Sequence, residues 1–301
     1  MNLFRSIILL MVCMSTAVFA EADVETQPVH ATLPKVGSWI FSGVATNEGG
    51  ERFGYFFQMQ RQGSVFHAKT ALIDGQTNKL IFFYDGQETI EATTNVDWHV
   101  GPSFLRYNPI NDSWIFGLKL AEKKGFNFKV DMLKKDNEDN ETLELKPGVE
   151  LQALETTRLN GHIKTDVNNK EQFVIGNKAW FARVWLTKAQ KEGPAISTTF
   201  CRLNNDNGFY AANLKEPITD KNGVAGWRDA AGVKLKMSKG ISIKSLANDE
   251  CLLHVGFPRV DMKLVNTLKS EDHSTPTLAG FSSKFPLGFC FVEEQSFLPF
   301  V

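Results

Sequence analysis

The chain has 301 residues, of which 43% are hydrophobic and 22% charged, with 33 basic and 34 acidic side chains. This composition can build a packed core and excludes a disordered or fibrous chain. The basic residues form no stripe of the kind that counterion release on DNA requires, so we expect no nucleic-acid partner. The length predicts one large domain or two domains of medium size.

The first 20 residues have the pattern of an export signal. Arg5 precedes the apolar run Ile7–Met14, and small residues follow as far as Ala20. These are the three regions of a secretory signal peptide, with cleavage expected after Ala20 or, as a second choice, after Ala22. No later run approaches the roughly 20 apolar residues of a membrane-spanning helix. We therefore expect an exported protein, periplasmic or secreted, and the signal does not choose between the two.

Removal of the signal peptide takes away Cys13 and leaves Cys201, Cys251 and Cys290. An oxidising compartment permits one disulfide among these three and leaves one thiol over, and the sequence does not select the pair. The chain has no CxxC motif and no Cys/His cluster, so we expect no metal site. It also has no dinucleotide-binding or phosphate-binding motif, so we expect no cofactor.

Apolar and polar residues alternate with a period of two along much of the chain, which is typical of half-buried strands. The alternating runs are residues 53–60, 80–84, 114–120, 126–132 and 233–238. Turn residues lie between apolar runs at 47–50, 62–64, 74–75, 85–86, 168–169 and 231–232. The best candidate for a helix is a short segment at 188–192. The pattern predicts an all-β protein built from antiparallel barrels or sandwiches.

One segment interrupts this pattern. Residues 134–141, KKDNEDNE, contain no apolar residue and predict a solvated loop, and a second series of strands begins near Val149. We therefore expect a signal peptide at 1–20, a first β domain at 21–148 and a second at 149–301. Two such domains would enclose a groove, which is a common location for a ligand.

Several short motifs resemble one known family. In the first half these are SWIFSG at 38–43, GERFGYFF at 50–57, and a strand from Phe66-His67-Ala68 to Asp74. In the second half they are TRLNGHI at 157–163 and FVIGNKAWF at 173–181. Their order and spacing resemble the carotenoid hydratase-like family, also called AttH-like. The resemblance implies two tandem lipocalin-like β domains.

The chain departs from the family at one motif. After the tryptophan of the second domain, the family reads Trp-x-Asp-His-x-Trp-Gly, and its active members use an acid to protonate an alkene in an apolar groove. Here both tryptophans remain, as Trp180 and Trp185, but Ala182 and Arg183 replace the Asp-His pair. Alanine cannot deliver a proton, so the resemblance implies the fold and the groove, while hydration would need another acid.

From these motifs we predict a ligand-binding site formed by Trp39, His67, Trp180, Arg183 and Trp185. The planar fork of Arg183 suits a carboxylate or phosphate head group, although an ion pair with a nearby acid would explain it equally. His67 lies on an alternating strand, where a hydrogen-bonded core or rim histidine is the simpler interpretation.

Proton transfer needs a positioned acid or imidazole, and the weak catalytic candidates are His67, Asp97 and His99. Asp97 and His99 would share one face of a strand, or form a polar rim. We therefore expect an exported protein that binds an apolar small molecule, a lipid or isoprenoid, in the groove between its domains, without hydratase chemistry. A hydratase, isomerase or cyclase acting on a hydrophobic substrate is the first alternative. A protein-interaction module of the envelope, or a secreted one, is the second.

Overall fold

The computed structural model describes residues 33–91, 95–132, 142–165, 170–215, 223–268 and 277–299. The predicted signal peptide, the loop at 134–141 and the turn at 168–169 lie outside these ranges. In the described ranges almost every regular element is a strand, with one short 3-10 helix at η2 (Ala121–Lys123). This confirms the all-β, lipocalin-like class. Within the same ranges no helix has the length and apolar character needed to cross a membrane.

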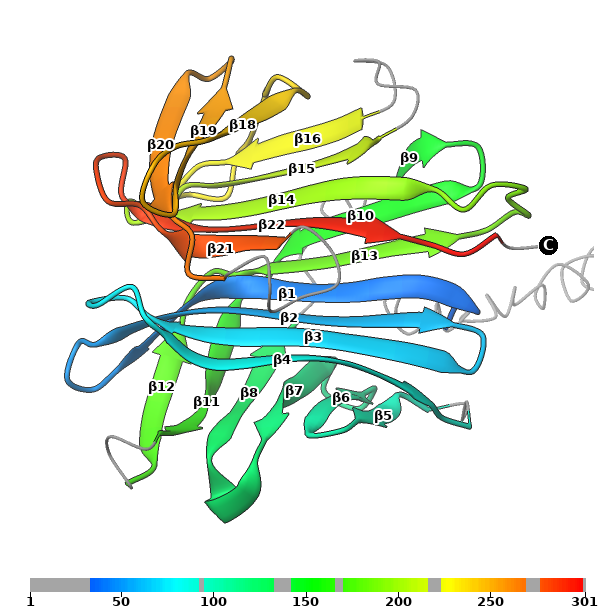
Figure 1. The fold of residues 1–301 in the computed structure, drawn as a ribbon, viewed down its shortest axis with the longest axis horizontal. Coiled ribbons are helices and arrows are strands. Elements are labelled where there is room, and N and C mark those ends of the chain that lie inside the picture. The colour runs from blue at the N-terminus through cyan, green and yellow to red at the C-terminus, as the bar shows by residue number, and fades with distance from the viewer. Residues whose placement is uncertain are drawn as a thin grey trace, which may run out of the picture.

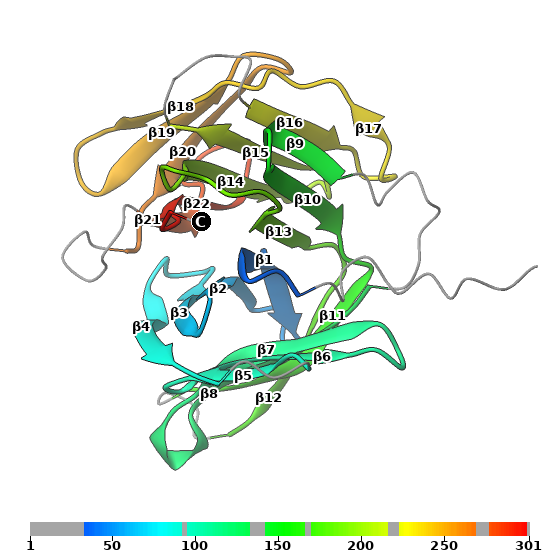
Figure 2. The same ribbon diagram turned by 90° about the vertical axis from the view of Figure 1, so that its right-hand side faces the viewer.

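Ten strands of the first sheet follow one path and form a nearly closed antiparallel barrel (Figures 1 and 2). The hydrogen-bonded order along this path is β4-β3-β2-β1-β12-β11-β8-β7-β6-β5, and its two end strands contact each other. The strands are β1 (Val36–Asn47), β2 (Arg52–Gln62), β3 (Val65–Asp74), β4 (Leu80–Thr89), β5 (Asp97–Val100), β6 (Ser103–Asn108), β7 (Ser113–Lys119), β8 (Gly125–Asp131), β11 (Arg158–Lys164) and β12 (Gln172–Gly176).

The long strand β1 connects this barrel to the rest of the molecule. Its first part, Gly37–Ser42, pairs with β13 (Trp180–Leu186), whereas its end, at Thr46 and Asn47, pairs with β12. β13 continues the sheet through β10 (Val149–Glu155) to β9 (Thr142–Lys146). The boundary expected between residues 148 and 149 falls between β9 and β10, which pair with each other, and the division into domains stays a prediction.

Two further sheets lie beyond this branch (Figure 2). The six-stranded sheet has the order β17-β16-β15-β14-β22-β21, and the three-stranded sheet has the order β18-β19-β20. Their strands are β14 (Ala195–Leu203), β15 (Gly208–Leu214), β16 (Gly223–Arg228), β17 (Lys234–Leu235), β18 (Ile241–Ser245), β19 (Glu250–Val255), β20 (Val260–Val265), β21 (Thr277–Phe281) and β22 (Gly288–Ser296).

The layers enclose three apolar cores. The first fills the barrel and is rich in rings, such as Phe41 stacked on Phe116 with centroids 4.3 Å apart. The second lies between the outer face of strands β1–β3 and the six-stranded sheet, where Phe56 stacks on Phe291 with centroids 4.3 Å apart. The third lies between the six-stranded and three-stranded sheets. The part of the barrel wall formed by β1–β3 is therefore covered on both of its faces.

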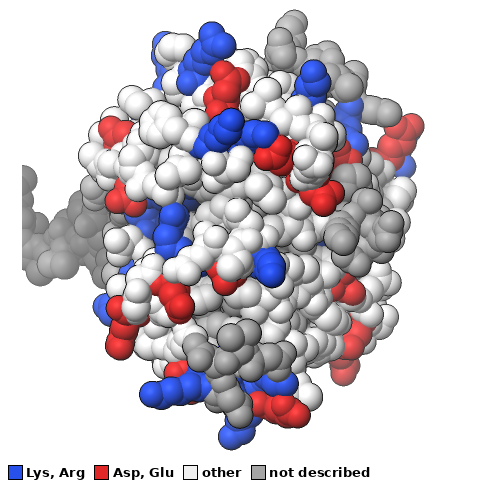
Figure 3. Space-filling model, turned by 60° about the vertical axis from the view of Figure 1, so that its left-hand side comes forward, with Lys and Arg blue, Asp and Glu red and all other residues white. Residues whose placement is uncertain are grey.

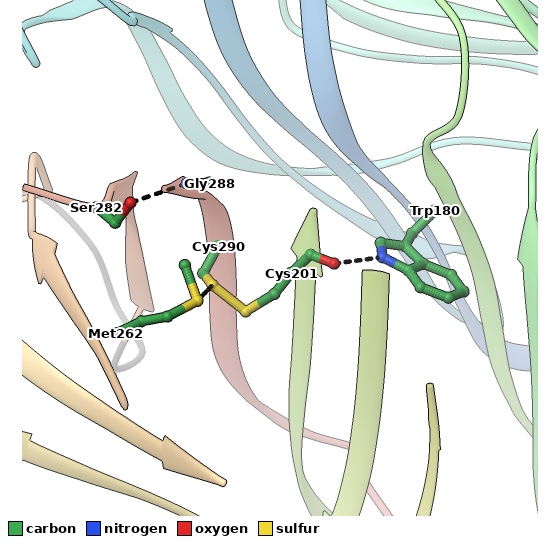
Figure 4. The surroundings of a disulfide bond; sticks show 6 residues. All are labelled: Trp180, Cys201, Met262, Ser282, Gly288 and Cys290. Carbon is green, nitrogen blue, oxygen red and sulfur yellow. Dashed lines mark hydrogen bonds between the residues drawn. A yellow bond between two sulfur atoms is a disulfide. The ribbon is translucent and has the colours of Figure 1, made fainter. Parts of the chain in front are cut away.

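Two cysteines join neighbouring strands of the six-stranded sheet. Cys201 on β14 and Cys290 on β22 are register partners and form a disulfide, and Met262 packs beside Cys290 (Figure 4). Cys251 is buried with a free thiol whose pKa burial raises to about 11. The structure thus shows one bridge and one free thiol, the pattern that three cysteines allowed.

Three local predictions are wrong. Residues 188–192 form no helix, because the segment is too short to nucleate one and Gln190 instead donates a hydrogen bond to the Pro147 carbonyl at 3.1 Å. Residues 233–238 contribute only the two-residue strand β17, since Leu235 faces solvent. Asp85 and Gly86 form no turn but lie within β4, where the Asp85 carboxylate bonds His67 of β3.

Candidate ligand-binding cleft

A cleft of about 410 Å³ lies between one end of the barrel and the six-stranded sheet. On the barrel side it is lined by the end of β1, the start of β2 and the end of β12. On the other side it is lined by the end of β14 and the turn that follows. We call this site the inter-sheet cleft, and its lining residues are Val44, Thr46, Arg52, Ile175, Gly176, Asn177, Lys178, Arg202, Leu203, Asn204 and Asp206.

The local structure of β1 and β2 shapes the barrel side of the cleft. β1 leaves β13 after Ser42 and joins β12 only at Thr46, so Val44 lies where the sheet branches. The β1–β2 turn is held by Asn47, whose Nδ2 donates to Gln172 Oε1 at 2.8 Å and so ties the turn to β12. Gly50 at φ +81° completes that turn, a conformation that favours glycine. The branch and the turn together form the barrel side of the cleft.

Arg202 is the most buried charged residue of the cleft, with 5% of its surface exposed. Its Nη1 donates to the Glu155 carboxylate of β10. Its Nε and Nη2 have no hydrogen-bond partner among the described residues. A Cβ at Gly208 would lie 2.7 Å from Nη1, so the glycine leaves the space that this side chain occupies. Glu155 therefore accepts a hydrogen bond from Nη1 alone, and Nε and Nη2 can donate to another acceptor.

Trp180 supports Arg202 from β13. Its indole Nε1 donates to the carbonyl of Cys201 at 2.9 Å, the residue before Arg202 (Figure 4). A Cβ at Gly208 would also lie 3.0 Å from Trp180 Cζ2, so the ring and the guanidinium pack against the same glycine. Since the disulfide fixes Cys201 on its other side, the backbone that carries Arg202 is held firmly.

Two more cations and one acid face the cleft. Arg52 donates from Nη2 to Asn204 Oδ1 at 2.7 Å, and burial lowers its pKa. Lys178 donates to the carbonyl of Ala230, and Asp206 lies at the rim. Basic and acidic side chains are interspersed on the face of the molecule drawn in Figure 3. The cleft lining itself holds three basic side chains, Arg52, Lys178 and Arg202, and one acidic side chain, Asp206.

A tyrosine hydroxyl lies close to the same guanidinium. Tyr55 is fully buried, and its hydroxyl has no hydrogen-bond partner within the described part of the chain. Burial raises the pKa of this phenol, and the nearby charge of Arg202 acts in the opposite direction. A Cβ at Gly43 would lie 2.9 Å from the hydroxyl oxygen, so that glycine makes room for it. The raised pKa makes this phenol a poor proton donor, and Tyr55 belongs to the barrel core and does not line the cleft.

The structure separates the five predicted ligand-binding residues into groups. Trp39 on β1 and Arg183 on β13 are register partners, and Arg183 lies over the Trp185 ring at 4.3 Å. Burial lowers the pKa of Arg183 to about 10, and the charge of Glu150 opposes that shift. Trp180 belongs instead to the middle core on the opposite face of β13. None of these residues lines the inter-sheet cleft, and their role in binding stays a prediction.

His67 lies apart from the tryptophans and Arg183. It projects from the face of β3 opposite Phe66, and its Nε2 bonds Asp85, while Lys69 Nζ lies 3.9 Å from the other carboxylate oxygen of Asp85. The side chain of His67 is 21% exposed, and that of Asp85 is 11% exposed. His67 therefore belongs to a polar cluster between the barrel and the second half, as a hydrogen-bonded histidine at a rim.

Asp97 and His99 share one face of β5, as strand geometry requires. Their side chains are 56% and 54% exposed, and His99 Nε2 lies 3.3 Å from Asp97 Oδ1. Arg106 of β6 donates to the same Asp97 oxygen at 2.7 Å. This is an exposed polar cluster on strands that do not line the cleft, and a catalytic role for it stays a prediction.

No sequence signal marks the residues that the cleft brings together. Arg202 lies in the run TTFCRLNN and Glu155 in LQALETT, and nothing in either run indicates that they meet. Packing of β10 against β14, two strands of different sheets, creates their contact across a separation of 47 residues. In the described ranges, His, Cys, Asp and Glu side chains form no group of three or more that could hold a metal ion.

The fold is similar to that of two solved structures. One is an AttH candidate, NE1406, from Nitrosomonas europaea, with a TM-score of 0.60 and 15% identity over 87% of this chain and 92% of that chain. The other is kievitone hydratase from Nectria haematococca, with a TM-score of 0.62 and 13% identity over 91% of this chain and 94% of that chain. No protein-family model and no curated protein matches the chain. At these identities the similarity establishes an AttH-like and hydratase-like fold.

Proposed function

We propose that this exported protein binds a small, largely apolar molecule in the inter-sheet cleft. The observation that carries the proposal is the composition of the cleft. Its walls are apolar at Val44, Ile175 and Leu203. The buried guanidinium of Arg202 has two nitrogens without a hydrogen-bond partner among the described residues. Clefts of about 300–1,000 Å³ with apolar walls and a few placed polar groups are the usual sites for small ligands. The Cys201–Cys290 disulfide supports export, because such bonds persist in oxidising compartments.

An enzyme of hydratase, isomerase or cyclase type is the second candidate. The similarity of the fold to kievitone hydratase favours it, and the Glu155 carboxyl group that pairs with Arg202 is an acid beside the cleft lining. A hydratase must protonate a carbon and add water, so it needs an acid near the double bond. The loss of the Asp-His pair at Ala182 and Arg183 makes Glu155 the replacement to test.

The test is native mass spectrometry of the protein purified from its own host, followed by organic extraction. The matched variants are Ile175→Trp, which fills the cleft from an exposed strand position, and Ile243→Trp on β18, which is similarly exposed outside the cleft. A bound molecule that is present in wild type and Ile243→Trp but absent in Ile175→Trp would support the proposal. A molecule lost instead in Trp185→Ala would move the site to the Trp39–Arg183–Trp185 group.

Incubation of the recovered molecule with the protein separates binding from catalysis. A product heavier by one water molecule, formed by wild type and lost in Glu155→Gln, would establish the hydratase alternative. An unchanged molecule would leave the protein as a binder. If host extract supplies no molecule to an empty protein, the cleft proposal fails and the search turns to protein partners.

A further inference from the structure

The chemistry of the inter-sheet cleft indicates what kind of ligand it takes. The cleft lining contains three positively charged side chains, Arg52, Lys178 and Arg202, and the carboxylate of Asp206. The carboxylate of Glu155 pairs with Arg202 and adds a second negative charge. The balance is one positive charge. A cleft with this charge suits a monoanion better than a dianion such as a phosphate monoester.

The hydrogen-bonding geometry of Arg202 indicates which anionic group the ligand carries. Glu155 occupies Nη1, and the two nitrogens without a hydrogen-bond partner among the described residues are Nε and Nη2. These two N–H groups form one edge of the planar guanidinium, and that edge matches the two oxygens of a single carboxylate. A buried donor without a partner is costly, so an acceptor at this edge stabilises the folded protein as well as the complex.

The walls indicate the rest of the molecule. Val44 and Ile175 on the barrel side and Leu203 on the sheet side are the apolar residues of the lining. An alkyl or isoprenoid chain could pack against these apolar side chains, while Arg52 and Lys178 contribute the charged part of the lining. The lining thus combines an apolar surface with a cationic one, as an amphipathic acid requires.

We propose that the cleft binds a monocarboxylic acid with an apolar chain, whose carboxylate accepts hydrogen bonds from Nε and Nη2 of Arg202. This inference rests on the proposed function, since it names the ligand class of the same cleft. It assigns Arg202, rather than Arg183, as the residue that recognises the anionic group. Arg183 is occupied by its contact with the Trp185 ring and is only 2% exposed.

The test compares two probes of equal chain length, decanoate and 1-decanol, by calorimetric titration of the full mature chain below the micellar concentration. Wild type should bind decanoate about tenfold more tightly than 1-decanol, or better. Arg202→Lys keeps the charge but loses the planar fork, so it should weaken decanoate binding about tenfold and leave 1-decanol binding unchanged. Arg61→Lys, at the other end of β2, is the control and should change neither affinity.

The outcomes distinguish the two proposals. If neither probe binds wild type and no host molecule is recovered, the proposed function itself fails. If both probes bind with equal affinity, or if Arg202→Lys leaves decanoate binding intact, the cleft binds apolar molecules and the carboxylate assignment is overturned. Thermal unfolding of Arg202→Lys without probe checks that the variant is folded. Arg52→Gln provides a second variant of the same lining, and it should weaken decanoate binding more than 1-decanol binding.

Discussion

Lys69 of β3 and Glu293 of β22 form a buried ion pair across the boundary between the barrel and the six-stranded sheet, with Nζ and Oε1 3.1 Å apart. The two side chains are 0% and 1% exposed and lie 224 residues apart in sequence. Lys69 also donates to Thr277 Oγ1 at 3.0 Å and lies 3.9 Å from Asp85. Lys69 of the barrel wall therefore interacts with two carboxylates, Asp85 from the first half of the chain and Glu293 from the second.

Replacement of this lysine should be strongly destabilising. Lys69→Met leaves the buried carboxylate of Glu293 without its cation, and loss of one partner from a buried pair costs about 3 kcal/mol or more of the free energy of unfolding. Urea unfolding at pH 7 measures the change. The matched control is Lys215→Met, which breaks the exposed pair with Glu294 of the same strand β22 and should cost less than about 0.5 kcal/mol. Equal effects of the two variants would contradict a special role for the buried pair.

Glu293 should give the stability a characteristic pH dependence. Burial raises its pKa, although Lys69 acts in the opposite direction. A raised pKa means that the folded state binds the proton more tightly than the unfolded chain, so this group stabilises the fold below its ordinary pKa of about 4.3 and loses that contribution as pH rises through the folded value. The free energy of unfolding of wild type relative to Glu293→Gln should therefore fall as pH rises above about 4.3.

Urea unfolding of both proteins between about pH 4 and pH 8, a range that spans the ordinary and the raised pKa of a carboxyl group, checks this sign. The Glu293→Gln variant should be tolerated at neutral pH, because the new amide oxygen can accept the hydrogen bond from Lys69 and Asp85 remains near that cation. A relative stability that rises with pH would show that the attraction of Lys69 outweighs burial and that the pKa of Glu293 is lowered.

The sequence predicted the strands of the barrel well, because each strand alternates over its own length. Phe53, Tyr55 and Phe57 of β2 point into the barrel as their period of two indicates. The environment of the polar residues on the opposite face of this strand is harder to predict. Gln58 and Gln60 are polar, which suggests a solvent-facing side, yet both are buried under the six-stranded sheet. Contacts such as that of Gln58 with Gln295, 3.1 Å apart across 237 residues, leave no local pattern.

The candidate site was less predictable for the same reason. Trp180 was selected from its motif, and it does support the backbone of the cleft through Cys201. Arg202 and Glu155 give no such indication of a shared site, since each is an ordinary residue of a strand. Their contact depends on how β10 and β14, which belong to different sheets, pack against each other, and no local pattern records that packing.

Gly54 should be essential to the packing of the barrel against the six-stranded sheet. A Cβ at this position would lie 2.5 Å from ring atoms of Phe289 and 2.8 Å from the Phe281 ring. Both rings are buried and cannot move aside freely, so Gly54→Ala should lower the free energy of unfolding by about 2 kcal/mol. Gly240→Ala is the control, because nothing lies within 4 Å of its Cβ position. In thermal unfolding, the melting temperature should fall only for Gly54→Ala. Equal melting temperatures of the two variants would exclude the predicted clash.

The Cys201–Cys290 disulfide should contribute a large part of the stability of the second half. It closes a segment whose ends are 89 residues apart, and loop-closure entropy for that length corresponds to about 4.6 kcal/mol. The double variant Cys201→Ala/Cys290→Ala should unfold at correspondingly lower urea concentration and lose any response to reductant. Cys251→Ala should keep that response, because the raised pKa and burial of its thiol keep it out of exchange. Since Arg202 directly follows Cys201, the double variant should also weaken decanoate binding, whereas unchanged binding would show that Trp180 alone holds that backbone in place.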